Sequence, residues 1–129
     1  MRATRDREAF VEAPVGRALL GANHVLWSDS PTTAGTVVWN RIDPREAELI
    51  TKAWDYEAKL DSPYRAVVDL AEFTSVDPAA FEIVARDMTA RLPALGQRIA
   101  RQALVRPPGM PGVLVAGFYP VLAPAFEWR

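Results

Sequence analysis

The chain of 129 residues contains no cysteine and only one histidine, and both scarcities restrict its chemistry. Without cysteine there is no disulfide, no thiolate zinc site and no thiol nucleophile. His24 would have to serve any Ser-His-Asp triad, yet no serine lies in a G-x-S-x-G elbow. A lone histidine in an apolar strand is more often structural than catalytic or metal-binding. We therefore predict a protein that is not an enzyme and has no metal or cofactor.

The sequence also lacks a long apolar run and an excess of charge of either sign. Its longest apolar run, Val113 to Phe118, is too short to span a bilayer, and its charged start has no signal-peptide core. With 15 basic and 16 acidic residues, the net charge is −1, which offers little counterion release on DNA. The arginines from Arg86 to Arg106 are spread over a predicted helix, loop and strand. We predict a cytoplasmic protein that binds neither a membrane nor, by itself, duplex DNA.

The sequence does contain enough apolar residues, 50% of the chain, to form the hydrophobic core of a single domain over residues 1–129. Residues 1–20 are predicted to be irregular, with a frayed charged end, because Pro14 and Gly16 interrupt any regular pattern. His24–Ser28 and Gly35–Trp39 are rich in β-branched and aromatic residues, and turn formers join them. This arrangement predicts an antiparallel strand pair.

A strong helix start follows this pair. Asp43 suits the N-cap, Pro44 the first helical position, and Glu46 the return contact of a capping box. The predicted helix has one apolar side and ends before Ser62. Glu57 falls on the apolar side, where it is either a buried acid with a raised pKa or a side chain that reaches solvent at the rim. We favour the second interpretation.

The stretch from Arg65 to Phe81 organises the rest of the chain. Its apolar run predicts a central strand, Arg65–Leu70, parallel to Val37–Trp39 because βαβ crossovers are right-handed. Asp77 is predicted to cap a second helix that ends at Pro93. The apolar residues of this helix with helical spacing are Phe81, Val84, Ala85, Met88 and Leu92.

A further strand, Gln102–Val105, is predicted beside the central strand. The pattern as a whole predicts a small α/β fold. It has one mixed sheet of about four to five strands, an antiparallel N-terminal pair followed by parallel βαβ units, with helices packed on it.

In an open α/β sheet, ligands bind just beyond the carboxyl ends of the strands. We therefore predict a ligand or partner surface at that edge, formed by Asp69, Glu72, Ser75 and Asp77. Trp39 and Trp54 are included as pocket residues, although tryptophans on a strand and its covering helix are more often core. An alternative is a small α/β enzyme or metal-dependent hydrolase that uses the acids Asp69, Glu72 and Asp77 at this edge.

The order of motifs resembles that of SpoIIAA-like, or STAS, domains. The motifs are G-T-V-V-W, I-D-P-R-E-A, R-A-V-V-D-L-A-E-F-T-S-V-D-P-A-A-F, R-Q-A-L-V-R-P-P-G and A-G-F-Y-P-V-L, and they cover about Gly35 to Arg129. The closest resemblance is to the version that precedes the DNA-binding half of AraC-type bacterial transcriptional regulators. The resemblance implies that Met110 to Leu122 forms a helix on the sheet. It also implies a non-catalytic sensory or protein-interaction domain, with a small-molecule effector or a regulatory protein as partner.

Two departures from the family qualify this expectation. Anti-sigma-factor antagonists of the STAS group carry a phosphate-accepting serine at the start of the second helix, where this chain has Asp77-Pro78-Ala79-Ala80-Phe81. We therefore expect no control by phosphate there. No AraC-type helix-turn-helix pair follows, so the resemblance implies a regulatory domain excised from the N-terminal part of a longer regulator. The alternative is a stand-alone antagonist-like protein without the phosphoserine.

The end of the chain predicts self-association. Phe126-Glu127-Trp128 alternates like the beginning of a strand, and similar domains continue into a final helix that covers the sheet. An uncovered apolar face favours pairing. We predict a homodimer that buries Trp128 and the surface from Val113 to Phe118.

Overall fold

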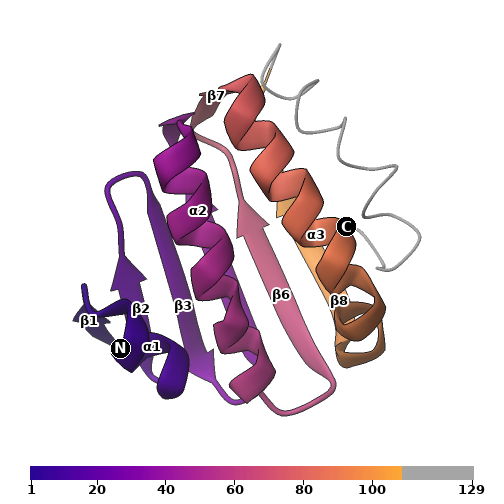
Figure 1. The fold of residues 1–129 in the computed structure, drawn as a ribbon. Helices are drawn as coiled ribbons and strands as arrows, with labels where there is room; N and C mark the ends of the chain where they lie inside the picture. The colour runs from indigo at the N-terminus through magenta and orange to yellow at the C-terminus, as the bar shows by residue number, and fades with distance from the viewer. Residues whose placement is uncertain (109–129) are drawn as a thin grey trace.

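In the computed structural model, which describes residues 1–108, six strands form a mixed sheet in the order β1-β2-β3-β4-β6-β8. The described helices lie on one face of this sheet (Figure 1). The strands of the main sheet are β1 (Arg2–Thr4), β2 (Arg17–Leu20), β3 (His24–Ser30), β4 (Thr33–Val38), β6 (Tyr64–Asp69) and β8 (Ile99–Val105). The remaining elements are the helices α1 (Arg7–Glu12), α2 (Pro44–Ala53) and α3 (Pro78–Arg98), the 3-10 helix η1 (Trp54–Lys59), and the strands β5 (Asn40–Ile42) and β7 (Phe73–Val76).

The central prediction, a small α/β fold with a mixed sheet, is confirmed, although the sheet has more strands than expected. β3 pairs with β4 in antiparallel fashion, and β6 runs parallel to both β4 and β8. β6 therefore has a hydrogen-bonded neighbour on each side, as predicted for the strand from Arg65 to Leu70. It is visible between α2 and α3 in Figure 1.

The prediction that residues 1–20 are irregular, with a frayed end, is wrong. β1 pairs with β2, and Asp6 caps α1 by accepting a hydrogen bond from the Ala9 amide. Phe10 of α1 is fully buried, and its ring lies 4.9 Å from that of Tyr56. Long-range packing therefore stabilises elements that are too short to show a periodic pattern of their own.

The second helix also differs from its prediction, because α3 continues through Pro93 to Arg98. A proline inside a helix costs about 3 kcal/mol or more. Contacts beyond the proline offset this cost: Leu95 packs against the core, and the Arg98 guanidinium donates to the backbone carbonyls of Glu57 and Leu60. The first helix likewise tightens into η1 at Trp54 instead of continuing as an α-helix.

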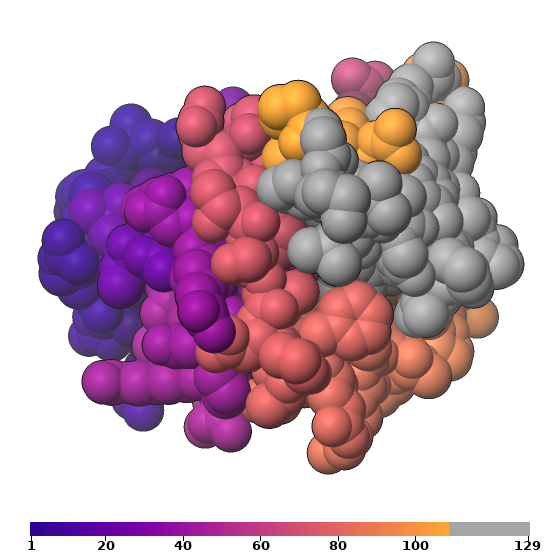
Figure 2. Space-filling view, turned by 90° about the horizontal axis from the view of Figure 1, so that it is seen from above, coloured from indigo at the N-terminus to yellow at the C-terminus, as the bar shows by residue number. Residues whose placement is uncertain are grey.

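Between the predicted strand, which ends at Leu70, and the predicted helix cap at Asp77 lies β7, which pairs in parallel with β5 as a small second sheet. This sheet brings the starts of the two long helices together, since β5 leads into α2 and β7 leads into α3. The two helices lie side by side, and their surfaces adjoin in the view from above (Figure 2).

The core between the helices and the sheet has two clusters of buried apolar residues. One contains Phe10, Tyr56 and Tyr64, and the other contains Ile50 and Phe73. Trp54 packs against both clusters. The Tyr56 hydroxyl donates to the Gly35 carbonyl at 3.1 Å, and burial raises the pKa of this tyrosine well above 10.0.

Several predictions for the C-terminal part lie outside the described residues. They are the helix from Met110 to Leu122, the strand beginning at Phe126, and the dimer surface at Trp128 and Val113 to Phe118. Among residues 1–108, no helix has the length and apolar character needed to cross a membrane.

Gly35 is expected to tolerate no side chain, because the indole of Trp27 lies against its Cα where a Cβ would stand. Replacing Gly35 with alanine should destabilise the fold by about 1 to 3 kcal/mol, the usual cost of overpacking. Urea denaturation followed by tryptophan fluorescence measures this loss. In a Trp27→Val background the ring is absent, so the same alanine should cost much less. Equal costs in both backgrounds would contradict the packing argument.

Candidate functional site

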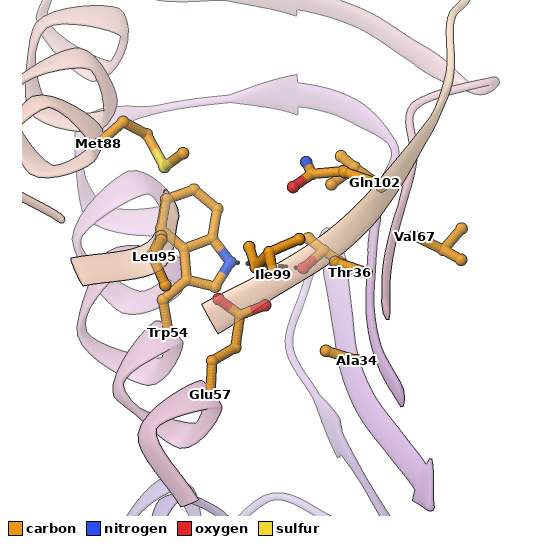
Figure 3. A pocket seen from close by; sticks show the side chains of 11 residues that line it. Ala34, Thr36, Trp54, Glu57, Val67, Met88, Leu95, Ile99 and Gln102 are labelled. Atoms are coloured by element: carbon orange, nitrogen blue, oxygen red, sulfur yellow. Dashed lines mark hydrogen bonds between the residues drawn. The ribbon is translucent and has the colours of Figure 1, made fainter. Parts of the chain in front are cut away.

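A cavity of about 40 Å³ lies between the helices and the sheet. It is lined by residues of β4, β6 and β8 on the sheet side and of η1 and α3 on the helix side (Figure 3). The apolar part of the lining comprises Ala34, Ala66, Val67, Val68, Met88, Leu95 and Ile99. A water needs roughly 10 to 15 Å³ measured in this way, so the cavity has room for about three water-sized atoms.

The cavity also has a polar lining formed by Thr36, Trp54, Glu57 and Gln102. The Trp54 indole N–H donates to the Thr36 hydroxyl at 3.4 Å. The amide of Gln102 and the carboxyl of Glu57 point into the same space from opposite sides (Figure 3). Gln102 is only 6% exposed, and its amide points into the cavity. A buried amide needs hydrogen-bond partners, so a ligand or water in the cavity would be stabilised beside it.

Glu57 is half-buried and lines the cavity, which corresponds to the interpretation that we did not favour from the sequence. Burial raises its pKa from 4.5 to about 7. The neighbouring Tyr64 hydroxyl and the charges of Arg91 and Arg98 offset part of this rise. Burial, followed by the Glu57 charge, also raises the pKa of Tyr64. Glu57 therefore changes its charge near neutral pH.

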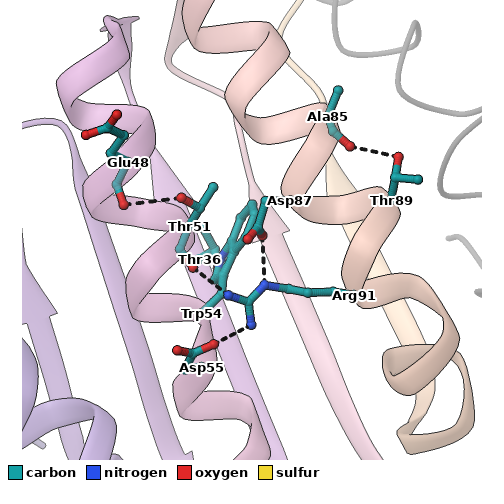
Figure 4. A network of polar contacts seen from close by, with 9 residues as sticks. All are labelled: Thr36, Glu48, Thr51, Trp54, Asp55, Ala85, Asp87, Thr89 and Arg91. Carbon is teal, nitrogen blue, oxygen red and sulfur yellow. Dashed lines mark hydrogen bonds and ion pairs between the residues drawn. The ribbon is translucent and has the colours of Figure 1, made fainter.

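Two arginines of α3 hold the helices together around the cavity. Arg91 forms ion pairs with Asp55 of η1 and Asp87 of α3, each with an N–O distance of 2.7 Å, and donates to the Thr51 carbonyl at 2.9 Å (Figure 4). Burial acts to lower the pKa of Arg91, but its bonds to Asp87 and Asp55 raise it overall. Arg98 lies over the Tyr64 ring at 5.7 Å while it binds the carbonyls at the end of η1. These contacts fix the helical side of the cavity.

Two of the acids predicted at the sheet edge, Asp69 and Asp77, contact other residues of the fold. Asp69 accepts a hydrogen bond from the Ala71 amide at 3.0 Å, which stabilises the turn after β6. Asp77 is the N-cap residue of α3 and Pro78 follows it at the first position, as predicted, but the Asp77 carboxyl pairs with Arg41 and makes no capping hydrogen bond. Arg41 precedes α2 in the chain, and this ion pair joins the starts of the two helices.

The other predicted site residues are scattered. Glu72 is exposed in the turn before β7, and Ser75 lies within β7. Trp54 lines the cavity, whereas Trp39 lies between β4 and β5 and is not part of the lining. Within residues 1–108 no group of three or more His, Asp and Glu residues is placed to hold a metal ion.

A second buried polar contact, which we did not predict, joins β3 to α2. The Nδ1 atom of His24 lies 2.6 Å from a carboxyl oxygen of Glu46, and the same oxygen accepts a hydrogen bond from the Asn23 amide at 2.8 Å. Glu46 therefore turns toward β3 and does not close the capping box. The other half of the box is confirmed, because Asp43 accepts from the Glu46 amide at 2.8 Å.

Sequence reasoning missed Gln102 and Glu57 as a pair, although each carried a signal. Gln102 is a polar residue at the start of the apolar run Ala103-Leu104-Val105, and Glu57 falls on the apolar side of its helix. A polar group at a buried position needs a partner. The signal could not show that the two positions face each other across a cavity.

No protein-family model matches this chain, and neither a curated protein nor a solved structure is similar enough to count as a match.

Proposed function

We propose that this chain is a non-catalytic sensory or protein-interaction domain of a bacterial transcriptional regulator, and that its cavity takes a small effector. The observation that supports the sensory role best is the buried Gln102 amide, which points into the cavity opposite the Glu57 carboxyl. The resemblance of the motifs from Gly35 onward to STAS-type domains supports the regulatory setting. A cytoplasmic location and a homodimer belong to the same proposal.

The position of the cavity suits a sensor. Its lining comes from three strands, from η1 and from α3, so a bound molecule would contact both helices and the sheet at once. A ligand shifts a conformational equilibrium by its difference in affinity for the two states. A ligand bound in this cavity would therefore change the position of α3 relative to α2 and η1.

The contacts at the sheet edge favour this proposal over the enzyme alternative. Asp69 holds a turn and Asp77 holds Arg41, so each carboxylate already stabilises the fold. A catalytic acid or base needs to reach a substrate proton. A sensory domain does not require the Asp69 or Asp77 carboxylate to be available to a substrate.

A thermal-shift screen tests the proposal with small amines, amides, alcohols and carboxylates. We expect at least one class to raise the melting temperature of the wild type by several degrees, since a ligand at about 100 times its Kd adds about 2.7 kcal/mol of stability. Ala66→Val, which reduces the cavity volume, should abolish this shift. Ala100→Val places the same change at an exposed position of the neighbouring strand and should preserve it.

Two results would count against a sensory role. One is the absence of any shift across the four compound classes. The other is hydrolytic turnover with divalent metals that disappears in Asp69→Asn, which would establish the enzyme alternative.

A further inference from the structure

We propose that the cavity binds a small primary ammonium group, either ammonium itself or the end of a short alkylamine, with Glu57 as its counterion and Gln102 as a hydrogen-bond acceptor. This inference rests on the proposed function and names the class of effector for the same cavity. It is argued from the charges around Glu57, from the acceptors that point into the cavity, and from the size of the space.

The charged groups around the cavity have a net charge of −1 when Glu57 is ionised, which favours the binding of one cation. Arg91 is paired with two carboxylates, those of Asp55 and Asp87. Arg98 donates to backbone carbonyls and carries the second positive charge. The two arginines and the two aspartates balance, so an ionised Glu57 adds one uncompensated negative charge to the group. A partly buried charge favours an opposite charge beside it, and a cationic ligand supplies that charge.

The acceptors suit an ammonium group, which has three or four N–H donors and accepts nothing. The Glu57 carboxylate offers oxygens on one side of the cavity, and the side-chain carbonyl of Gln102 offers one on the other (Figure 3). The Thr36 hydroxyl receives the Trp54 N–H and retains a further lone pair. The Trp54 indole also lines the cavity, and an indole ring attracts a cation. An ammonium group would thus donate to the carbonyl oxygen of the Gln102 amide.

The size and the apolar lining limit the rest of the ligand. A cavity of about 40 Å³ holds about three heavy atoms, as in methylammonium or ethylammonium. Met88, Leu95 and Ile99 border the same space, and they would pack against one or two carbon atoms. A bulky or anionic ligand is excluded by volume and by charge.

Proton release should accompany binding. The cation binds the ionised form of Glu57, so the affinity rises with pH until this group is ionised in the free protein. The other titratable or charged groups facing Glu57 are Tyr64, Arg91 and Arg98. Because burial holds the pKa of Glu57 at about 7, the affinity should increase about tenfold from about pH 6 to about pH 8.

Isothermal titration calorimetry on the 129-residue protein tests this inference. The ligands are methylammonium chloride, the neutral acetamide of similar size, and potassium chloride as the ionic-strength control. We expect methylammonium to bind about tenfold more tightly at about pH 8 than at about pH 6. Heats measured in two buffers of different ionisation enthalpy should report proton release below about pH 7.

Matched variants locate the site. Glu57→Gln should abolish methylammonium binding, and Gln102→Leu should weaken it at least tenfold. The exposed pair Glu48→Gln and Gln97→Leu carries the same chemical changes outside the cavity and should leave binding unchanged. Circular dichroism confirms that each variant is folded. Ala66→Val gives a second test, because it reduces the cavity volume without altering a polar group.

The outcomes separate this inference from the proposed function. Acetamide binding that persists in Glu57→Gln would overturn the ammonium class and leave a sensory cavity in place. Methylammonium binding that is indifferent to both Glu57→Gln and Gln102→Leu would overturn the assignment of the site. If potassium bound as tightly as methylammonium, recognition would not depend on N–H donors, and the ammonium class would be overturned. The absence of heat with all three ligands would overturn the inference, while the broader thermal-shift screen decides the proposed function.

Discussion

Replacing Glu46 with alanine is expected to destabilise the fold by about 1 to 3 kcal/mol, the usual cost of leaving a buried polar group without its partner. His24 is 1% exposed and Glu46 is 6% exposed, and their side chains meet at 2.6 Å. Without the carboxyl, the His24 Nδ1 atom and the Asn23 amide lose their common partner inside the protein. Urea denaturation at neutral pH measures the loss as a lower transition midpoint.

Glu48 provides the matched control for this substitution. It lies two residues further along α2 with its side chain exposed, so Glu48→Ala should change stability by less than about 0.5 kcal/mol. The double variant His24→Leu, Glu46→Leu should lose less than Glu46→Ala, because no polar group is then left buried without a partner. A loss below about 1 kcal/mol for Glu46→Ala would show that water replaces the carboxyl, and it would contradict the argument.

The parts of the fold that could be predicted are those whose signals lie within a short stretch of sequence. Asp43 and Pro44 mark the start of α2 through the groups that they offer to the first helical turn. The run Ala66-Val67-Val68 marks a strand through its apolar side chains. The parallel pairing of β6 with β4 then follows from the handedness of the crossover.

The parts that could not be predicted depend on partners far away in the sequence. β1 has three residues and is stabilised by pairing with β2. α3 passes through Pro93 because Arg98 at its end reaches the carbonyls of η1. In both cases a local rule predicts the opposite, and a long-range contact outweighs it.

The candidate site lies beneath the helices and not at the sheet edge, where it was predicted, for the same reason. Asp69 and Asp77 do lie at the end of β6 and the start of α3, as the crossover pattern predicts. What the pattern cannot show is which carboxylates find a partner. Asp77 meets Arg41, which is 36 residues away, and Glu57 lies beside a cavity formed by three strands and two helical segments.

The cavity itself is a product of packing, not of periodicity. Small side chains at Ala34 and Ala66 leave space under Trp54, and only the assembled sheet brings these two residues beneath the same helix. In a close-packed interior, such a space persists where polar groups can be hydrated or bound. The Gln102 amide and the Glu57 carboxyl provide those groups.

The last prediction concerns the effect of pH on stability through Glu57. Its pKa is raised from 4.5 to about 7 in the folded protein because burial disfavours the charged form. Below about pH 4.5 the group is protonated in both states, so the free energy of unfolding is unaffected. As the pH rises from about 4.5 to about 7, the unfolded chain releases the proton while the folded protein retains it. The group's contribution to stability is therefore lost over this range, by an amount on the order of 3 kcal/mol, and stays constant above it.

Glu57→Gln should remove this dependence, since an amide has the shape of the protonated acid and does not titrate. We expect the variant to match the wild type near pH 4.5 and to exceed it by about 3 kcal/mol at about pH 8. Urea denaturation of both proteins across this range gives the two curves, and their difference cancels the acids that they share, such as Asp55 and Asp87. Glu48→Gln, an exposed change on α2, should instead follow the wild type. Parallel curves for Glu57→Gln and the wild type would show that Glu57 titrates normally, and the cavity would then present a fully ionised carboxylate at neutral pH.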